Sequence, residues 1–262
     1  MKFKKMHGNG NDFIIIENLT QTISLTKSQI IKMGDRKKGL GFDQLITINP
    51  PKKNHHDLHI KFFNTDGSEA SMCLNGVRSV GAFVWESKLL PKKPMLLGTK
   101  SRDILIKPTG SKNVKAVIDF PFKEKIPAAE MKLLKKEKVC FVNVGNHHLL
   151  IESTKIDDYD LSDLCEKLRK RKFFRDANIS LWKKTGSAIV SRTNEAGAGE
   201  TLSCGSAAAA IASVALGSAK KIIVISKGGK ISLRNMGDKL EMTGPAELIC
   251  EGVWAKNYMQ KT

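Results

Sequence analysis

Apolar positions along the chain fall into short runs separated by turn residues, a pattern typical of a protein with many strands. Turn-forming breaks such as Asn49-Pro50-Pro51 and Gly228-Gly229 lie between the runs. The predicted strands are Phe13–Ile16, Leu45–Ile48, Leu58–Phe63, Ile104–Ile106, Val114–Phe120, Val139–Val144, Ile179–Trp182, Ala188–Ser191 and Ile222–Ile225.

Helical spacing of apolar residues appears in four other stretches. These are Gln29–Met33, Val77–Val84, Leu161–Leu168 and Ser206–Leu216. The last stretch is small and apolar on every side, which predicts a helix enclosed by protein and not one lying on a surface. Strands mixed with helices predict a mixed α/β fold.

Two segments half a chain apart resemble each other. Cys73 lies in GSEASMCLNGVRS and Cys204 lies in GAGETLSCGSAAA. Each cysteine follows a glutamate by four residues and precedes a predicted helix, and the two are 204 − 73 = 131 residues apart. Half the chain therefore separates two similar cysteine segments.

Two further pairs of polar residues keep nearly the same spacing. Nine residues before each cysteine, Asn64 and Glu195 end predicted strands, and GNGNDFIII near Asn11 resembles VGNHHLLIE near Asn146. The cysteine segments and these two further pairs are three matching features, and together they indicate duplication of one unit of about half the chain.

The duplication predicts two similar α/β domains that face each other. We expect one domain to comprise residues 1–110 with 253–262, and the other to comprise residues 111–252. The stretch Pro108–Lys112 is the best candidate for a connection between them.

Charge and composition narrow the function. The 262 residues include 44 basic and 26 acidic side chains, a net charge of +18, but 36 of the basic residues are scattered lysines and only 8 are arginines. Nucleic-acid binding favours clustered arginine and stacking aromatics, so we expect no nucleic-acid partner. From the net positive charge we infer only an attraction for small anionic molecules.

Membrane and secretory classes are also not expected. The longest apolar stretch, Ala207–Leu216, falls short of the ~18 residues of a membrane span, and the N-terminal apolar run is too short for a signal peptide. Five cysteines without a CxxC pair fit neither a disulfide framework nor a zinc ribbon. We therefore expect a cytoplasmic protein.

The paired cysteines differ in context from the other three. Cys140, Cys165 and Cys250 are expected to be ordinary structural residues. Cys73 and Cys204 each precede a helix start, where unpaired N–H groups and the helix dipole favour a thiolate. A pseudo-twofold would point both sulfurs at one cleft from opposite sides.

Opposed thiols suit inversion of a carbon centre by proton transfer. A thiolate removes the Cα proton from one face while a thiol delivers a proton to the other. Helix N-termini aimed at the α-carboxylate would stabilise the carbanion that develops. The cysteines lack metal-ligand spacing, and a Cys/His hydrolase would explain only one of them.

The sequence resembles the diaminopimelate epimerase family almost from end to end. The matching segments are MHGNGNDF at Met6–Phe13, DRKKGLGFDQ at Asp35–Gln44, FFNTDGSEASMCLNG at Phe62–Gly76, VGNHH at Val144–His148, ANIS at Ala177–Ser180, EAGAGETLSCGS at Glu195–Ser206 and GPAELICEG at Gly244–Gly252. The resemblance implies two pseudo-symmetric domains, each a sheet wrapped around a central helix, with the active site in the cleft between them. It also implies conversion of LL- to meso-diaminopimelate, for lysine and peptidoglycan synthesis, without pyridoxal phosphate.

The resemblance also implies a set of site residues. Cys73 and Cys204 are the acid/base pair, His148 and Glu195 tune or orient the site, and Ala196 occupies a substrate-binding position. The polar substrate-binding residues are Asn11, Gln44, Asn64, Asn146 and Asn178, and the backbone N–H groups for the α-carboxylate lie at Leu74, Asn75, Gly205 and Ser206. No cofactor or metal is expected, the partner is a small amino acid, and a homodimer is compatible with the sequence.

Three departures from the family pattern leave alternatives open. Ala196 stands where the family has an arginine, Leu74 stands where it has a glycine, and His147 stands where it has a proline. Loss of an arginine opposite a carboxylate weakens binding. The alternatives are a cofactor-independent racemase of another amino acid, and a weakened or catalytically silent relative that binds an anionic partner.

Overall fold

The chain divides into two compact units in a computed structural model that describes residues 1–110, 112–134 and 138–255. Unit 1 comprises Met1–Ala116 and Gly244–Thr262, and unit 2 comprises Val117–Thr243. These ranges differ by several residues from the domains expected from the sequence, whose last seven residues, 256–262, lie outside the described part. The domain boundaries stay a prediction.

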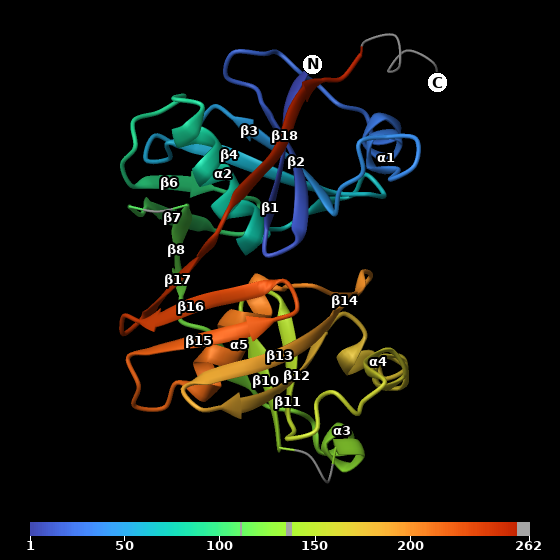
Figure 1. Cartoon of the computed structure of the whole chain (residues 1–262). Helices are drawn as coiled ribbons and strands as arrows, with labels where there is room; N and C mark the ends of the chain where they lie inside the picture. Colours follow the sequence, from blue (N-terminus) through green and yellow to red (C-terminus); the bar gives the residue numbers. More distant parts are fainter. Residues whose placement is uncertain (111, 135–137, 256–262) are drawn as a thin grey trace. The chain divides into compact units, whose positions relative to one another are not determined.

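Unit 1 is a curled sheet with two helices (Figure 1). Its strands are β1 (Lys2–Gly8), β2 (Asn11–Glu17), β3 (Gln44–Asn49), β4 (Leu58–Asn64), β5 (Glu69–Ala70), β6 (Met95–Gly98), β7 (Asp103–Pro108) and β18 (Glu247–Val253), and its helices are α1 (Lys27–Gly34) and α2 (Leu74–Glu86). Pairing runs β18–β1–β2–β3–β4–β6–β7, with β2–β3 and β4–β6 parallel and the remaining pairs antiparallel.

Unit 2 repeats this topology. Its strands are β9 (Phe122–Glu124), β10 (Lys138–Asn143), β11 (His147–Glu152), β12 (Asn178–Thr185), β13 (Ala188–Glu195), β14 (Gly199–Thr201), β15 (Lys221–Ser226) and β16 (Gly229–Asn235). Its helices are α3 (Ala128–Met131), α4 (Leu161–Arg169) and α5 (Gly205–Ala215), with 3₁₀ turns at Lys132–Leu134 and Lys172–Phe174. Pairing runs β9–β10–β11–β12–β13–β15–β16, with β11–β12 and β13–β15 parallel. Two strands, β8 (Asn113–Asp119) and β17 (Lys239–Pro245), run from one unit into the other.

Each sheet wraps around one buried helix. In α2, every residue from Leu74 to Trp85 is buried, and the helix contacts β1, β2, β7 and β18. In α5, the alanine-rich stretch Ala207–Ala212 is buried among β10, β11, β12, β15 and β16. The predicted mixed α/β fold, with two pseudo-symmetric halves each built around a central helix, is confirmed.

A second helix covers the outer face of each sheet, and this explains the continuous apolar strands. In β2, Ile14 and Ile16 pack with Ile30 of α1, whereas Phe13 faces Gly76 of α2. A strand covered on both faces has no polar side, so its sequence reads as an unbroken apolar run and not as an alternation. In unit 2, α4 packs in the same way on β11 and β12.

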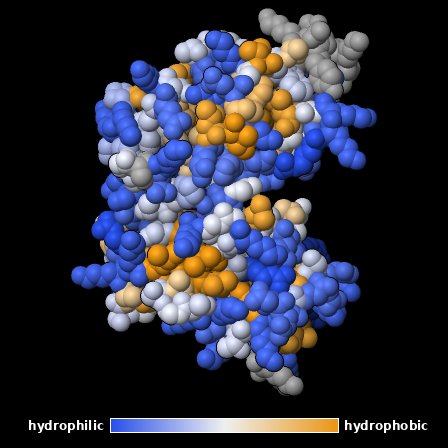
Figure 2. Space-filling model, viewed as in Figure 1, coloured by the Kyte–Doolittle hydropathy of each residue, from blue (hydrophilic) through white to orange (hydrophobic). Residues whose placement is uncertain are grey.

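The surface of each unit is mainly polar. Figure 2 shows hydrophilic residues over most of the visible face of each unit, with smaller apolar patches between them. In the described part of the chain, no helix has the length and apolar character needed to cross a bilayer.

We expect Gly39→Ala to destabilise unit 1. A Cβ at this position would lie 2.3 Å from the Lys32 carbonyl oxygen and 2.6 Å from that of Met33, where backbone and not a flexible side chain blocks it. Overpacking of this kind costs about 1–3 kcal/mol, measurable by urea denaturation. Gly110→Ala is the matched control because a Cβ there meets nothing within 4 Å. Equal stability of the two variants would contradict the close approach.

Candidate functional site

The predicted polar residues of unit 1 gather at one edge of its sheet. Asn11 begins β2 and Gln44 begins β3, which is parallel to β2, while Asn64 ends β4, which is antiparallel to β3. Strand direction therefore brings all three to the same edge. Gln44 and Asn64 are partners in register, and Gln44 Nε2 donates to Asn64 Oδ1 at 3.0 Å.

Cys73 caps the buried helix at this edge. It is the N-cap residue of α2, and its sulfur accepts the backbone N–H of Gly76 at 3.5 Å. Asn11 Oδ1 lies 3.5 Å from the Cys73 sulfur and accepts from Asn75 Nδ2 at 3.4 Å. Leu74 and Asn75, predicted to offer backbone N–H groups, form the first turn of α2, and both are buried.

A fully buried arginine lies behind that turn. Arg78 is 0% exposed and donates to Asn75 Oδ1 at 2.9 Å and to the Leu74 carbonyl at 3.4 Å. Burial lowers its pKa to about 10, and negative charge on Cys73 opposes that shift. The space for the guanidinium depends on Gly244, where a Cβ would lie 3.0 Å from Arg78 Nε. The sequence motif contains this residue, but only its burial shows its place in the site.

Charged side chains fix the start of β2. Asp12 accepts from Arg36 at 2.8 and 3.1 Å and pairs with Lys5 at 3.2 Å. Burial acts to raise the pKa of Asp12, but hydrogen bonds from Arg36 and Lys5 outweigh it and hold that pKa below its usual value. Asp43, just before β3, accepts from Asn11 Nδ2 at 2.8 Å and from Arg36. This network positions Asn11 and the start of β3.

Unit 2 places the equivalent residues at the equivalent positions. Asn146 precedes β11, Asn178 begins β12, and Glu195 ends β13. Asn178 Oδ1 accepts the backbone N–H of Ala196 at 2.9 Å. Arg169 of α4 holds this edge, donating to the Asn194 side chain at 2.7 Å and to the Ala177 carbonyl at 3.3 Å. Arg36, just after α1, and Arg169, at the end of α4, thus play similar parts: each holds the sheet edge that carries the predicted polar residues of its unit.

Cys204 is the N-cap residue of α5 and is buried. Its sulfur lies 3.4 Å from the Ser206 hydroxyl, which also accepts from Asn146 Nδ2 at 3.4 Å. Burial raises the pKa of Cys204 well above its usual value, and the Glu195 carboxylate raises it further, against the opposing effect of Ser206. Gly205 forms the first residue of α5 beside it.

His148 lies directly behind Asn146. It is 0% exposed, and its Nε2 lies 3.3 Å from Asn146 Oδ1. Burial, helped by the charge of His147, lowers the pKa of His148 to about 3. The imidazole is therefore neutral at physiological pH and acts here as a hydrogen-bonding group.

Ala196 stands where the family has an arginine. Among the described residues nearest to Ala196, no other arginine takes its place. Arg192 forms a two-pronged pair with Glu200 at 2.8 and 2.9 Å and also donates to two backbone carbonyls. Arg192 and Lys227 lower the pKa of Glu200 to about 2. Ala196 itself is exposed, in a turn between β13 and β14.

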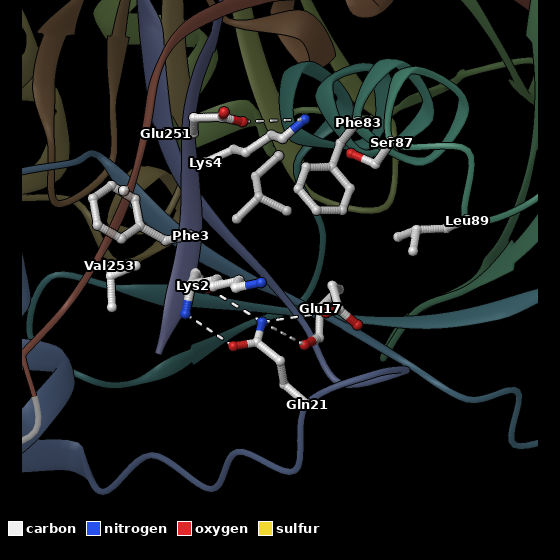
Figure 3. A pocket seen from close by; sticks show the side chains of 12 residues that line it. Lys2, Phe3, Lys4, Glu17, Gln21, Phe83, Ser87, Leu89, Glu251 and Val253 are labelled. Atoms are coloured by element: carbon white, nitrogen blue, oxygen red, sulfur yellow. Dashed lines mark hydrogen bonds and ion pairs between the residues drawn. The ribbon is translucent and has the colours of Figure 1, made fainter.

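A pocket of unit 1 lies away from these residues. Its volume is about 520 Å³, and it is lined by residues of β1, β2 and β18 and by Phe83, Ser87 and Leu89 at the C-terminal end of α2 (Figure 3). Cys73 is at the other end of that helix, about 20 Å away at 1.5 Å per residue. Polar groups of the pocket pair with one another, as Gln21 does with Lys2 and Glu17.

Solved structures share this fold. The chain is similar to a phenazine biosynthesis PhzC/PhzF protein from Clostridium difficile, with a TM-score of 0.74 at 15% identity over 97% of this chain and 99% of the other. It is also similar to a probable proline racemase from Agrobacterium radiobacter, with a TM-score of 0.72 at 11% identity over 99% and 94% of the two chains.

Sequence relatives define the family. A model of diaminopimelate epimerase matches residues 3–118 and 140–249. A diaminopimelate epimerase from Coxiella burnetii is 33% identical, covering 97% of this chain and 99% of its own length. The protein is therefore an isomerase of the epimerase and racemase class. Within that class, the chain belongs to the diaminopimelate epimerase family, which acts in lysine biosynthesis.

We expect His148 to make stability fall in acid. Its folded-state pKa, about 3, lies below the 6.5 of an unfolded histidine, so protons bind preferentially to the unfolded chain between these values. This costs about 1.4 kcal/mol per pH unit below 6.5, or ~2 kcal/mol at pH 5. Denaturation at pH 7 and pH 5 measures it. A His148→Gln variant, which cannot titrate, should lose correspondingly less, and an identical loss in both proteins would contradict the buried neutral imidazole.

Proposed function

We propose that this protein interconverts LL- and meso-diaminopimelate, using Cys73 and Cys204 as the two proton-transfer groups. The observation that carries the proposal is the repeated site: in each unit a cysteine caps a buried helix beside polar strand ends. Membership of the diaminopimelate epimerase family supports the choice of substrate, and the pair of similarly placed cysteines supports the proposed chemistry.

The neighbours of the two sulfurs support different starting states. Negative charge on Cys73 would interact favourably with the buried Arg78 cation, whereas burial and the Glu195 carboxylate raise the pKa of Cys204. We therefore propose Cys73 as the thiolate and Cys204 as the thiol. In the proposed step the Cys73 sulfur takes the Cα proton and the Cys204 S–H bond delivers a proton to the opposite face. After the step, Cys73 is a thiol and Cys204 is a thiolate. Proton exchange with solvent then restores the starting protonation state of each sulfur.

In this proposal, the N-terminal ends of α2 and α5 stabilise the carbanion intermediate. When the proton leaves, negative charge develops at Cα and spreads onto the α-carboxylate. Backbone N–H groups at Leu74–Asn75 and Gly205–Ser206 are proposed to donate hydrogen bonds to that carboxylate. The positive end of each helix dipole adds to this effect. The amides of Asn11, Asn64 and Asn178 can both donate and accept, which suits an amino acid with polar groups at both ends.

The proposed setting is the cytoplasm, with a small amino acid as substrate and without nucleic acid, membrane or added cofactor. A homodimer remains part of the proposal.

The two-thiol proposal is tested with LL-diaminopimelate in deuterated water. We expect meso product that carries solvent deuterium at Cα, because the delivered proton comes from a thiol that exchanges with solvent. Cys73→Ala and Cys204→Ala should each lower the rate by at least about 10²–10⁴-fold, the usual contribution of an acid or base.

Cys250→Ala is the matched control, since this cysteine is exposed on β18 and should be dispensable. Near-normal turnover of Cys204→Ala would overturn the two-base scheme. Absence of any deuterium incorporation by the unaltered protein would point to a silent relative.

A second candidate function is racemisation of a different amino acid, favoured by Ala196. In diaminopimelate the distal carboxylate needs a partner, and Arg192 is committed to Glu200. If diaminopimelate is nevertheless the substrate, Ala196→Arg should lower its KM about tenfold or more, equivalent to ~1.5 kcal/mol for a charged hydrogen bond.

Ala198→Arg places the same charge two residues away on the same exposed turn and is the control. It should change KM little, as should Ala196→Arg for an amino acid without a distal carboxylate. An unchanged KM, or loss of activity on adding the arginine at 196, would favour the second candidate.

A further inference from the structure

A histidine–carboxylate cluster lies in unit 1 apart from the cysteine edge. His55 Nε2 is 3.3 Å from one carboxylate oxygen of Asp103, and His56 Nε2 is 2.9 Å from the other. The cluster precedes β4, whereas Asn64 is the last residue of that strand. Seven strand residues separate them by about 20 Å, so the cluster is not part of the proposed catalytic machinery.

Backbone pairing builds this cluster. Gly98 of β6 pairs with Asp103 of β7, and the His56 ring lies over Gly98. A Cβ at Gly98 would lie 2.3 Å from His56 Nδ1 and 2.4 Å from Cε1, so the ring occupies the space that a side chain would fill. The glycine thus seats the imidazole beside the carboxylate of the paired strand.

The buried imidazole is poorly satisfied by protein groups. The His56 side chain is 3% exposed, and its Nδ1 has no hydrogen-bond partner among the described residues. Its Nε2 is close to Asp103 but makes no regular hydrogen bond there. The His55 ring lies edge-on to it, with centroids 4.5 Å apart, and is more than half exposed. Two imidazole nitrogens therefore converge on one carboxylate that solvent can reach.

We propose that His55, His56 and Asp103 bind one divalent transition-metal ion such as Zn²⁺. Donor atoms of the three residues lie within 4.8 Å of one another. Zinc bonds of 2.0–2.2 Å in a tetrahedron put donors ~3.3 Å apart, close to the 3.3 and 2.9 Å already present. Two imidazoles with one carboxylate suit zinc, nickel or copper better than calcium or magnesium, which prefer all-oxygen sites.

Three protein ligands leave a coordination position for water, so the site is open. The ion would link the turn before β4 to the start of β7 and would compete with protons for the imidazoles. Lys53 places positive charge near Asp103, but it is exposed and its effect is screened by salt.

The test is a Zn²⁺ titration of the full-length chain followed by NMR of the histidine ring nitrogens. A Cys73→Ser/Cys204→Ser background removes the two proposed catalytic thiols, which would compete for zinc. One equivalent of Zn²⁺ should shift Nε2 of His55 and His56 and leave His7, His59 and His148 unchanged. The same sample should show a rise in melting temperature.

Matched variants decide the assignment. Asp103→Asn and His55→Ala alter exposed or half-exposed side chains and should fold, and each should weaken zinc at least tenfold by calorimetry. His147→Ala, which alters an exposed histidine of unit 2 near Glu124, should bind as tightly as the parent. Shifts of His55 and His56 with pH but not with Zn²⁺, or equal affinity in Asp103→Asn, would overturn the proposal.

Discussion

Enclosing a helix on all sides by its own sheet is the constraint on which the rest of this structure depends. A helix leaves its first N–H groups without intrahelical partners, and a buried start must find acceptors nearby. In α2 the Cys73 sulfur accepts one of these groups, and the adjoining amides of Asn11 and Asn75 hold one another. At the start of α2, the sulfur and the polar side chains are therefore brought together by a requirement of folding.

The starts of the two buried helices have opposite charges near them. A buried cation, Arg78, lies under the first turn of α2, whereas Glu195 lies beside the N-cap of α5. Identical topology thus gives two sulfurs with different electrostatic surroundings. This difference is what the proposed two-thiol inversion needs, since one sulfur must act as a base and the other as an acid.

Local pattern predicted many of the buried elements, but it missed the buried strands β6, β11 and β17 as well as exposed ones. The apolar run Phe13–Ile16 identified β2 because both of its faces are covered. In β18, ELICEGV, six of the seven residues are exposed, so no periodicity marks it; pairing with β1, more than two hundred residues away, makes it a strand. Arg78 was missed for a related reason, since only the fold reveals that a charged helix residue is buried.

Membership of the site stays a prediction, and what the structure adds is the contacts between the predicted residues. The motifs singled out Asn11 and Glu195, and strand direction places them at sheet edges. Sequence spacing left Arg192 open as a substitute for the missing arginine, and only the pair with Glu200 shows that it is committed elsewhere. The approach of His56 to Asp103 joins residues 47 positions apart and has no signature in the sequence.

The pairing of β18 with β1 also sets an order of events during synthesis. Unit 2 is continuous in the chain and is complete before the ribosome reaches β18, whereas unit 1 lacks the strand that pairs with Lys2–His7 until β18 itself has been made. Domains fold as units while the chain emerges. The second half of the duplication is therefore able to fold first, and the first half waits with the edge of β1 uncovered until β18 has been synthesised.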